Sequence, residues 1–414
     1  MRIDSYWTYL FGRWMNFNDS HPPIMSLLWA LTDKIISGPG GMFLLHQVLI
    51  VYSLYLLSLV ALKNGKRLFS LPFLGVFYPP VSCLIYFISK DLSLASFLLL
   101  GFSFWYFWRS QNRLNYVKMI LIMAILFYSS AVRHNSLSAT IPLILLFVLH
   151  SIPSVKKALC VTLVIVALFF QGNRFLTYTI LNASKVNQSQ ILMAHDLMGI
   201  YAITRKNYFP NDYLSQNRLD EYMKKFDHRT LDATTFIEGN LIIIDNDLKT
   251  LSLLKKDWLT AISEQPMAYL RHRWILFRCL LYDPLQIAYT VSMPPIKQYS
   301  GYALPLLKET WLGKIHNRIF DWTRKYLSVL FFPLSYVLAN CIFIVFAARR
   351  RIWSSIALSV SALLYTSLYF FFAPSAIFRY VYWAVFATLL SLFTLWIEWK
   401  SPRNEVCLDA AHES

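Results

Sequence analysis

The chain has 414 residues, of which 57% are hydrophobic and only 15% are charged, whereas soluble domains carry about 25% charged residues. The net charge of +17 would suggest nucleic-acid binding in a soluble protein, but most short basic clusters lie at the ends of apolar runs. These features exclude a soluble globular domain. They predict an all-α polytopic membrane protein whose partner is the lipid bilayer and not nucleic acid.

Residues 1–40 precede the first long apolar run. Within them, residues 24–36 are apolar but too short to cross a hydrocarbon core of roughly 30 Å. The Gly-Pro-Gly-Gly sequence at 38–41 then ends the run. We therefore expect an interfacial helix over 24–36, lying on the membrane surface.

Apolar runs predict nine transmembrane helices, six within residues 41–172 and three within residues 326–398. Some runs are short for a bilayer, so we expect their ends to extend into neighbouring residues. The predicted spans lie near 41–62, 68–88, 92–108, 117–131, 136–150, 158–172, 326–347, 352–372 and 381–398.

Short basic clusters predict which ends of the spans face the cytoplasm. They are Lys63 with Lys66 and Arg67, Arg109 with Arg113 and Lys118, Lys156 with Lys157, Arg349 to Arg351, and Lys400 with Arg403. With all of them cytoplasmic, the spans alternate without conflict and the tail 399–414 lies inside. The segment 173–325 then lies outside, and its apolar stretch 274–281 predicts a second interfacial element.

The same topology makes the first predicted span run inward, so residues 1–40 must lie on the outer face. Nothing before them would carry them across the membrane. We therefore expect that an additional first span is missing from this sequence; the alternative is that the short N-terminal tail is translocated unaided.

The five cysteines contain no Cys-x-x-Cys pair, and the histidines lack metal-ligand spacing. Neither a disulfide framework nor a zinc site is predicted. No cofactor is indicated, although the sequence leaves a divalent metal open. The sequences His-Glu-x-x-His and Gly-x-Ser-x-Gly and a Walker loop are also absent, which weakens metalloprotease, serine hydrolase and ATPase readings.

Two acidic positions precede the interfacial helix. Asp19-Ser20-His21-Pro22-Pro23 comes directly before it, and the two prolines start the helix stiffly at a fixed φ. This would hold Asp19 and His21 at a set height above the membrane. The alternative is that Asp19 or Ser20 merely caps the helix. Asp4 lies further upstream, and composition alone indicates only an ordinary acidic residue near the terminus.

Two short outer loops carry isolated charges, which at membrane depth suggest function. Lys90-Asp91 opens one span, and lysine is a point charge suited to phosphate. Arg133-His134-Asn135 opens another, and arginine offers a planar fork for phosphate or carboxylate. A local ion pair or snorkelling would equally explain the first loop, and a helix cap by Asn135 the second.

The last outer loop holds Arg379-Tyr380 after an aromatic run. A cation beside aromatic rings suits a phosphate head group or a sugar face, but an interfacial aromatic belt with a snorkelling arginine is the alternative. His195-Asp196, inside the outer segment, is read as a structural pair and not as a catalytic dyad.

The predicted topology places these charges on one face of the membrane. Lys90, Arg133 and Arg379 lie in short loops that must pack together, and Asp4 and Asp19 share their face. Cations beside acids at a lipid–water boundary suit a lipid phosphate donor and a general base.

With these motifs the chain resembles membrane glycosyltransferases of the GT-C fold, the class of protein O-mannosyltransferases and lipid A aminoarabinose transferases. An acid followed by an Asp-x-His-Pro-Pro-like motif is the shared pattern, matched here by Asp4 and by Asp19 to Pro23. A group of bacterial membrane proteins in this class is more similar still. Its pattern is matched by His21 to Trp29, Lys90-Asp91, Arg133 to Asn135 and Arg379-Tyr380.

The resemblance implies a polyprenyl-phosphate sugar donor and a glycan, glycolipid or protein acceptor, in a bacterial inner membrane with the site facing the periplasm. It also implies inversion at the anomeric carbon. Asp4 would be the base, and Asp19 a second catalytic acid that shapes the site. Substrate binding would fall to His21, Lys90, Asp91, Arg133, His134, Asn135, Arg379 and Tyr380.

Two other functions fit a polytopic protein of this kind. An O-antigen polymerase or ligase also has a large outer loop and essential arginines, but it does not need an acid plus His-Pro-Pro. A transporter or flippase of lipid-linked substrates should show broken spans in matching halves. Tyr78-Pro79-Pro80 interrupts one span, and no matching partner is found.

Overall fold

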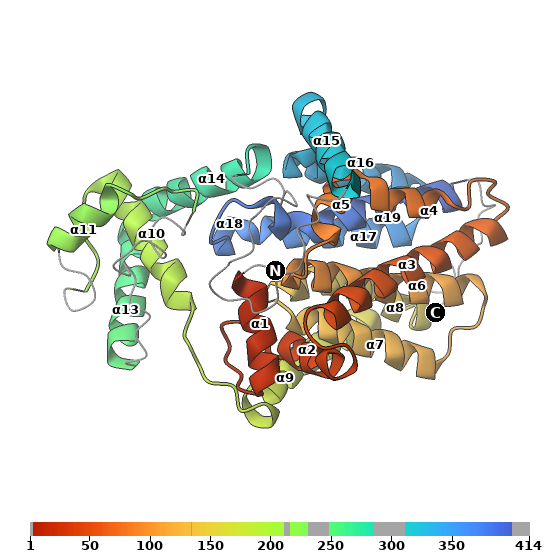
Figure 1. Cartoon of the computed structure of the whole chain (residues 1–414), viewed down its shortest axis with the longest axis horizontal. Helices are drawn as coiled ribbons and strands as arrows, with labels where there is room; N and C mark the ends of the chain where they lie inside the picture. Colours follow the sequence, from red (N-terminus) through yellow and green to blue (C-terminus); the bar gives the residue numbers. More distant parts are fainter. Residues whose placement is uncertain (1–2, 134, 211–215, 231–247, 285–310, 400–414) are drawn as a thin grey trace. The chain divides into compact units, whose positions relative to one another are not determined.

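The computed structural model describes residues 3–133, 135–210, 216–230, 248–284 and 311–399. Every named element in these ranges is a helix (Figure 1). Six of the described helical stretches are long and apolar enough to cross a membrane, so the chain is an all-α polytopic membrane protein. They are α3 (Gly40–Lys63), α6 (Lys90–Ser110), α9 with η2 (Val155–Ile180), α16 (Pro333–Arg350), α17 with α18 (Trp353–Phe372) and η5 with α19 (Phe378–Glu398).

The structure differs from the nine predicted spans at three places. Helices α7 (Tyr116–Ala131) and α8 (Ser136–Ser151) match their predicted positions but are shorter apolar helices. The predicted span 68–88 is not one helix, because it divides into α4 (Leu71–Leu74), η1 (Gly75–Phe77) and α5 (Pro79–Ile85). Tyr78 has an extended backbone there, which the following prolines enforce by excluding the helical conformation of the residue before them.

The chain forms two compact units. Unit 1 comprises Met1–Ala183, Ala288–Thr366 and Arg379–Ser414, and unit 2 comprises Ser184–Ile287 and Ser367–Phe378. The predicted outer segment 173–325 therefore does not coincide with one unit. Its end, including α15 (Trp311–Tyr326), belongs to unit 1, while the last predicted outer loop contributes to unit 2.

Helix α6 forms the centre of unit 1. It runs beside α3, α7, α8 and α19 (Figure 1), and most of its side chains are buried. Trp105 of α6 stacks on Phe147 of α8 with ring centroids 4.9 Å apart. Trp383 of α19 is fully buried and donates a hydrogen bond from Nε1 to Ser361 Oγ at 2.9 Å. These contacts bury large aromatic surfaces and satisfy the polar atom that would otherwise be costly in an apolar interior.

The two ends of α6 differ in chemistry. Ser89 caps its start, where the side-chain oxygen accepts from Leu92 N at 3.1 Å. At the other end, Arg109 lies 3.9 Å from Glu398, and the Lys63 ammonium donates to the carbonyl of Ser110. A helix of 21 residues separates these ends by roughly 30 Å. Lys63 and Arg109, two of the predicted cytoplasmic cations, therefore lie at the end of α6 that is opposite Lys90.

Helices α1 (Ile3–Trp14) and α2 (Pro23–Ile35) cross closely because both present small residues at the contact. A Cβ atom on Gly12 would lie 2.2 Å from the carbonyl oxygen of Ser26. Beside this crossing Tyr9 packs on the fully buried Trp29, with ring centroids 5.4 Å apart. The crossing holds α1 in place at its C-terminal half, which fixes the position of its first turn.

Unit 2 is built from α10 (Ser189–Thr204), α11 (Gln216–Met223), α13 (Leu248–Glu264), α14 (Pro266–Tyr282) and α18 (Tyr369–Phe372). An apolar cluster around Leu197, Met198 and Leu254 forms its core. Fully buried Arg273 of α14, next to the predicted interfacial stretch 274–281, binds Asp196 through two nitrogens at 2.7 Å each. Buried charges need such pairing, so this face of α14 is a protein-packing face.

We expect Gly12→Ala to lower the thermal midpoint of the protein in detergent. The added methyl group has no space against the Ser26 carbonyl, so α1 and α2 must separate, and overpacking of this kind costs about 1–3 kcal/mol. Gly40→Ala is the matched control, because its Cβ would meet only Ile36 Cγ2 at 3.4 Å. Equal midpoints for the two variants would contradict the close crossing.

Candidate functional site

A small pocket in unit 1 is lined by residues of α1, of α2 and the loop before it, of the start of α6, and by Arg379 of η5 (Phe378–Val381). These segments are far apart in sequence. Polar and charged side chains dominate its lining, which consists of Asp4, Ser5, Thr8, His21, Met25, Ser89, Lys90 and Arg379. The structure thus brings together the predicted acid Asp4, the predicted histidine His21 and two of the predicted cations.

Asp4 and Arg379 form an ion pair in this pocket. Arg379 Nη2 donates to Asp4 Oδ2 at 3.0 Å, and the arginine side chain is only 9% exposed. Burial raises the pKa of Asp4, but the charges of Lys90 and Arg379 outweigh it and hold the pKa well below its ordinary value. Asp4 is therefore a carboxylate throughout the physiological range.

Lys90 supplies positive charge to the same pocket. The turn before it is fixed by the Ser89 cap and by Ser5, whose hydroxyl donates to the Ile88 carbonyl at 2.5 Å. Among the described residues, the Lys90 ammonium forms no hydrogen bond or salt bridge, although it interacts electrostatically with Asp4, Arg133 and Arg379. Its charge is thus available to an anion that enters the pocket.

Asp91, the residue after Lys90, joins two arginines behind the pocket. Its side chain is 1% exposed and forms a salt bridge with Arg133, and Arg379 Nε lies 3.9 Å from its Oδ2. The guanidinium carbons of Arg133 and Arg379 lie 5.0 and 5.4 Å from the ring centroid of Tyr380. The carboxylate and the ring face together stabilise the two like charges at close range.

His21 closes one side of the pocket. Its ring packs on Phe11 with centroids 5.9 Å apart, and its Nδ1 is buried with no hydrogen-bond partner among the described residues. Burial lowers the pKa of His21 to about 4, and the charge of Lys90 acts in the same direction. The imidazole is therefore neutral at pH 7 and can accept or donate a hydrogen bond without adding charge.

Besides Asp91, Arg133 and Tyr380 behind the pocket, two described residues that were predicted for the site, Asp19 and Asn135, do not line it. Asp19 accepts a hydrogen bond from Tyr178 Oη at 2.9 Å. Asn135 is the N-cap residue of α8, but its side chain makes no cap hydrogen bond. His134 lies outside the described residues. Pro22 is the N-cap residue of α2 and makes no side-chain cap hydrogen bond.

Four pocket residues were not predicted from the sequence. Ser5 and Thr8 follow Asp4 at one and four positions, and helical spacing brings Thr8 to the Asp4 face. Thr8 Oγ1 donates to the Asp4 carbonyl at 2.7 Å. Ser89 directly precedes Lys90 and is a typical cap residue. Met25 lies within the stretch His21 to Trp29 that carries the family resemblance, but no role was predicted for it.

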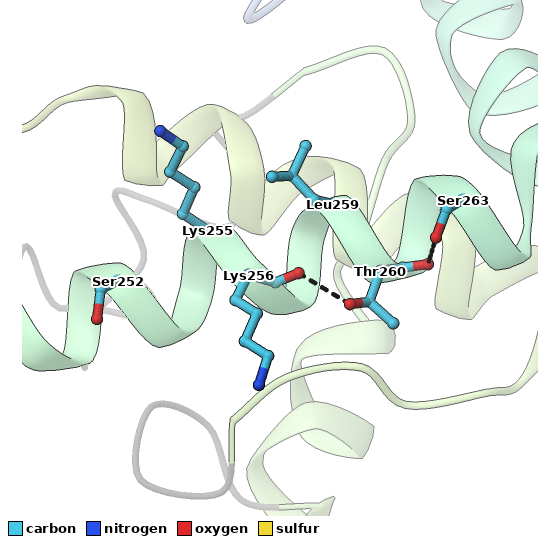
Figure 2. A pocket seen from close by; sticks show the side chains of 6 residues that line it. All are labelled: Ser252, Lys255, Lys256, Leu259, Thr260 and Ser263. Carbon is cyan, nitrogen blue, oxygen red and sulfur yellow. Dashed lines mark hydrogen bonds between the residues drawn. The ribbon is translucent and has the colours of Figure 1, made fainter.

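A second hollow lies on α13 in unit 2 and is shown in Figure 2. Its lining comes from one exposed helix face and consists of Ser252, Lys255, Lys256, Leu259, Thr260 and Ser263. Thr260 and Ser263 donate to backbone carbonyls of their own helix, at 3.0 and 2.9 Å. Their hydroxyls are thus used locally, and the face gathers no convergent chemistry.

His195 and Asp196 take part in separate contacts within unit 2. Asp196 also accepts from Trp258 Nε1 at 3.0 Å, in addition to its bonds to Arg273. His195 packs on His272 with ring centroids 4.7 Å apart. Burial lowers the pKa of His195 to about 3 and raises that of Asp196. The arrangement is that of a buried structural network and gives no exposed dyad.

No group of three or more His, Cys, Asp or Glu residues that could hold a metal ion occurs within the described ranges. No protein-family model, curated protein or solved structure matches this chain. The pocket must therefore be interpreted from its own chemistry.

Removing the carboxylate behind the pocket should strongly destabilise the protein. Asp91→Asn removes the carboxylate that forms a salt bridge with Arg133 and lies 3.9 Å from Arg379 Nε. Breaking one side of a buried ion pair costs about 3–5 kcal/mol. Thermal midpoints in detergent would measure the loss. Asp91→Asn combined with Arg133→Gln should recover part of it, because the double variant removes both charges. Additive losses would show that the pair is not coupled.

The matched control for this experiment is Glu264→Gln, which breaks the exposed pair between Lys206 and Glu264 in unit 2. Solvent screens that pair, so the midpoint should hardly change.

His21 should make the stability of the protein dependent on pH in the acid range. The pKa of His21 is about 4 in the folded protein and near 6.5 in the unfolded chain. Between these two pH values the unfolded chain binds a proton at His21 and the folded protein does not. Stability from this group is complete above pH 6.5 and is lost as the pH falls towards 4. Thermal midpoints measured across this window should fall less steeply for His21→Gln than for the parent. Parallel curves would contradict a neutral, buried His21.

Proposed function

We propose that this chain is a membrane glycosyltransferase of the GT-C type. It would transfer a sugar from a polyprenyl-phosphate donor to a glycan, glycolipid or protein acceptor in the cell envelope. The observation that carries the proposal is the pocket at the start of α6, where the uncommitted Lys90 ammonium lies with the Asp4 carboxylate and Arg379. This is the chemistry that a lipid-phosphate leaving group and an attacking hydroxyl require.

The cations would bind the donor phosphate. Lys90 offers a point charge, and Arg379 a planar fork with several donors. Since Lys90 begins a candidate membrane span, a phosphate bound there could keep its lipid chain in the bilayer. The phosphate gains negative charge as its bond to the sugar breaks, and cations fixed in advance stabilise that charge most effectively.

Asp4 would act as the general base. The acceptor oxygen forms a bond to the anomeric carbon while the bond from that carbon to the phosphate oxygen breaks, and the hydroxyl proton passes to the Asp4 carboxylate. A single displacement of this kind inverts the anomeric centre. Asp4 lies in the pocket, whereas Asp19 is held by Tyr178, which favours Asp4 as the base and leaves Asp19 a positioning role.

The ion pair between Asp4 and Arg379 makes the base dependent on the donor. With Arg379 on its carboxylate, Asp4 has a depressed pKa and is a weak base. A phosphate that draws Arg379 away would raise that pKa and increase the basicity of Asp4. Donor binding would thus activate the base, and Asp91 would keep Arg379 within reach of both partners.

The proposal places the protein in a bacterial inner membrane with the pocket facing the periplasm. The basic residues at the opposite end of α6 support this orientation, because cytoplasmic ends of spans are enriched in lysine and arginine.

We expect Asp4→Asn to lower sugar transfer by at least about 100-fold, the usual contribution of a general base. Polyprenyl-phosphate binding should be retained or strengthened, because Arg379 loses its ion pair with the Asp4 carboxylate. The measurement is mass spectrometry of surface glycans, glycolipids and glycoproteins from a strain lacking the gene, complemented by the parent or the variant at equal abundance. Lipid-phosphate binding to the purified proteins completes the comparison.

Asp33→Asn is the matched control, because that acid faces Arg13 outside the pocket. It should restore the modified glycan, and Asp19→Asn should restore it in part. A change in polymer length with unchanged repeat mass would favour a polymerase or ligase. Identical spectra from the deletion strain and its parent would contradict glycosyl transfer.

A further inference from the structure

Helix α15 exposes a continuous apolar stripe. Its members recur at intervals of three and four positions, which places them on one helix face. The stripe consists of Trp311, Ile315, Ile319, Trp322 and Tyr326. All five are exposed, and Trp311, Ile319 and Trp322 are 68%, 54% and 57% accessible. Such a stripe is unfavourable in water, so it needs an apolar partner.

The remaining surface of α15 divides into two further faces. One is packed against unit 1, because Phe320 and Thr323 are buried and the Phe320 ring lies 5.2 Å from that of Phe331. The other is charged and exposed, with four basic residues and one acid: Lys314, Arg318, Arg324, Lys325 and Asp321. The helix is thus attached to the protein by one face, basic on the second and apolar on the third.

The position of α15 brings this apolar stripe close to a membrane span. After α15 the chain makes the short helix η4 (Ser328–Phe331), and α16, a candidate span, begins at Pro333. Helix α15 packs against η4 and α5 (Figure 1). Much of α16 is exposed as well, including Leu338, Ile342 and Val345. The apolar stripe therefore lies beside the surface that lipid must cover around α16.

We propose that α15 binds an anionic lipid surface, with its apolar stripe in the headgroup region and its basic face toward lipid phosphates. The chemistry selects lipid over a protein partner for two reasons. Tryptophan and tyrosine are enriched where one end of a side chain is apolar and the other wet, as at the membrane interface. A neighbouring face with a net positive charge matches anionic headgroups, which attract basic amphipathic helices.

This surface is distinct from the pocket at the start of α6 and does not depend on the proposed glycosyl transfer. It assigns a peripheral membrane-binding role to a helix that does not itself span the bilayer. By holding α15 at the interface, lipid would also fix the short helices α5 and η4 against which it packs.

The test is photocrosslinking of the full chain in vesicles made of equal parts phosphatidylcholine and phosphatidylglycerol. Trp322→benzoylphenylalanine puts a probe of similar size in the apolar stripe. Asp321→benzoylphenylalanine, one residue earlier on the charged face, is the matched control. Intact mass after illumination identifies the crosslinked partner.

We expect phospholipid adducts at position 322, several-fold more abundant than at position 321, with phosphatidylglycerol over-represented relative to the vesicle. A covalent dimer or a crosslink within the chain would show that protein covers the stripe and would overturn the proposal. Equal or absent lipid adducts at the two positions would also overturn it.

The role of charge is tested by replacing Lys314, Arg318 and Lys325 with glutamine in the chain that carries the probe at position 322. Lipid adducts should persist in this variant, but the share of phosphatidylglycerol should fall to its share in the vesicle. A persistent excess of phosphatidylglycerol would show that the basic face does not select anionic lipid.

Discussion

Two arginines, one after α7 and one before α19, converge on the single carboxylate of Asp91 in the first turn of α6. Charges at this depth are costly unless they are paired, so the three helix ends can meet only in the arrangement that satisfies them. The pocket is a consequence of that meeting. Arg379 is left with one nitrogen toward Asp91 and another toward Asp4, and Lys90 lines the same pocket as Asp4 and Arg379.

The pocket combines two opposing electrostatic demands. Its cations hold Asp4 ionised and suit an anionic ligand, yet the same cations weaken Asp4 as a base. An anion that enters relieves this conflict by competing for Arg379. The neutral imidazole of His21 adds no further charge to the balance. The electrostatics therefore favour a ligand that brings its own negative charge over a neutral one.

The convergence of Lys90, Arg133 and Arg379 could be predicted because isolated cations in short loops on one membrane face have little room to separate. The apolar runs likewise indicated the main helices, since long apolar segments must either span a bilayer or be buried. Pro79 and Pro80 indicated where residues 68–88 divide, because proline lacks the backbone N–H that a continuous helix needs. A hydropathy profile does not contain this information.

Other features depend on contacts between distant residues and left no local signal. The hydrogen bond from Tyr178 to Asp19 joins positions 159 residues apart. Asp91 could be placed beside Lys90 from the sequence, but its role as the shared partner of two arginines could not. The amphipathic pattern of α15 is regular in its spacing, but within the segment 173–325 only the apolar stretch 274–281 was interpreted as an interfacial element.

The ion pair between Asp4 and Arg379 joins residues that are 375 positions apart. Because a ribosome makes the chain in order, Asp4 is synthesised long before Arg379. Contacts of such high sequence separation form late and close a large loop. The pocket is consequently assembled only after residue 379 has been synthesised and inserted. A translation product interrupted before that point would carry the acid without the cation that completes the pocket.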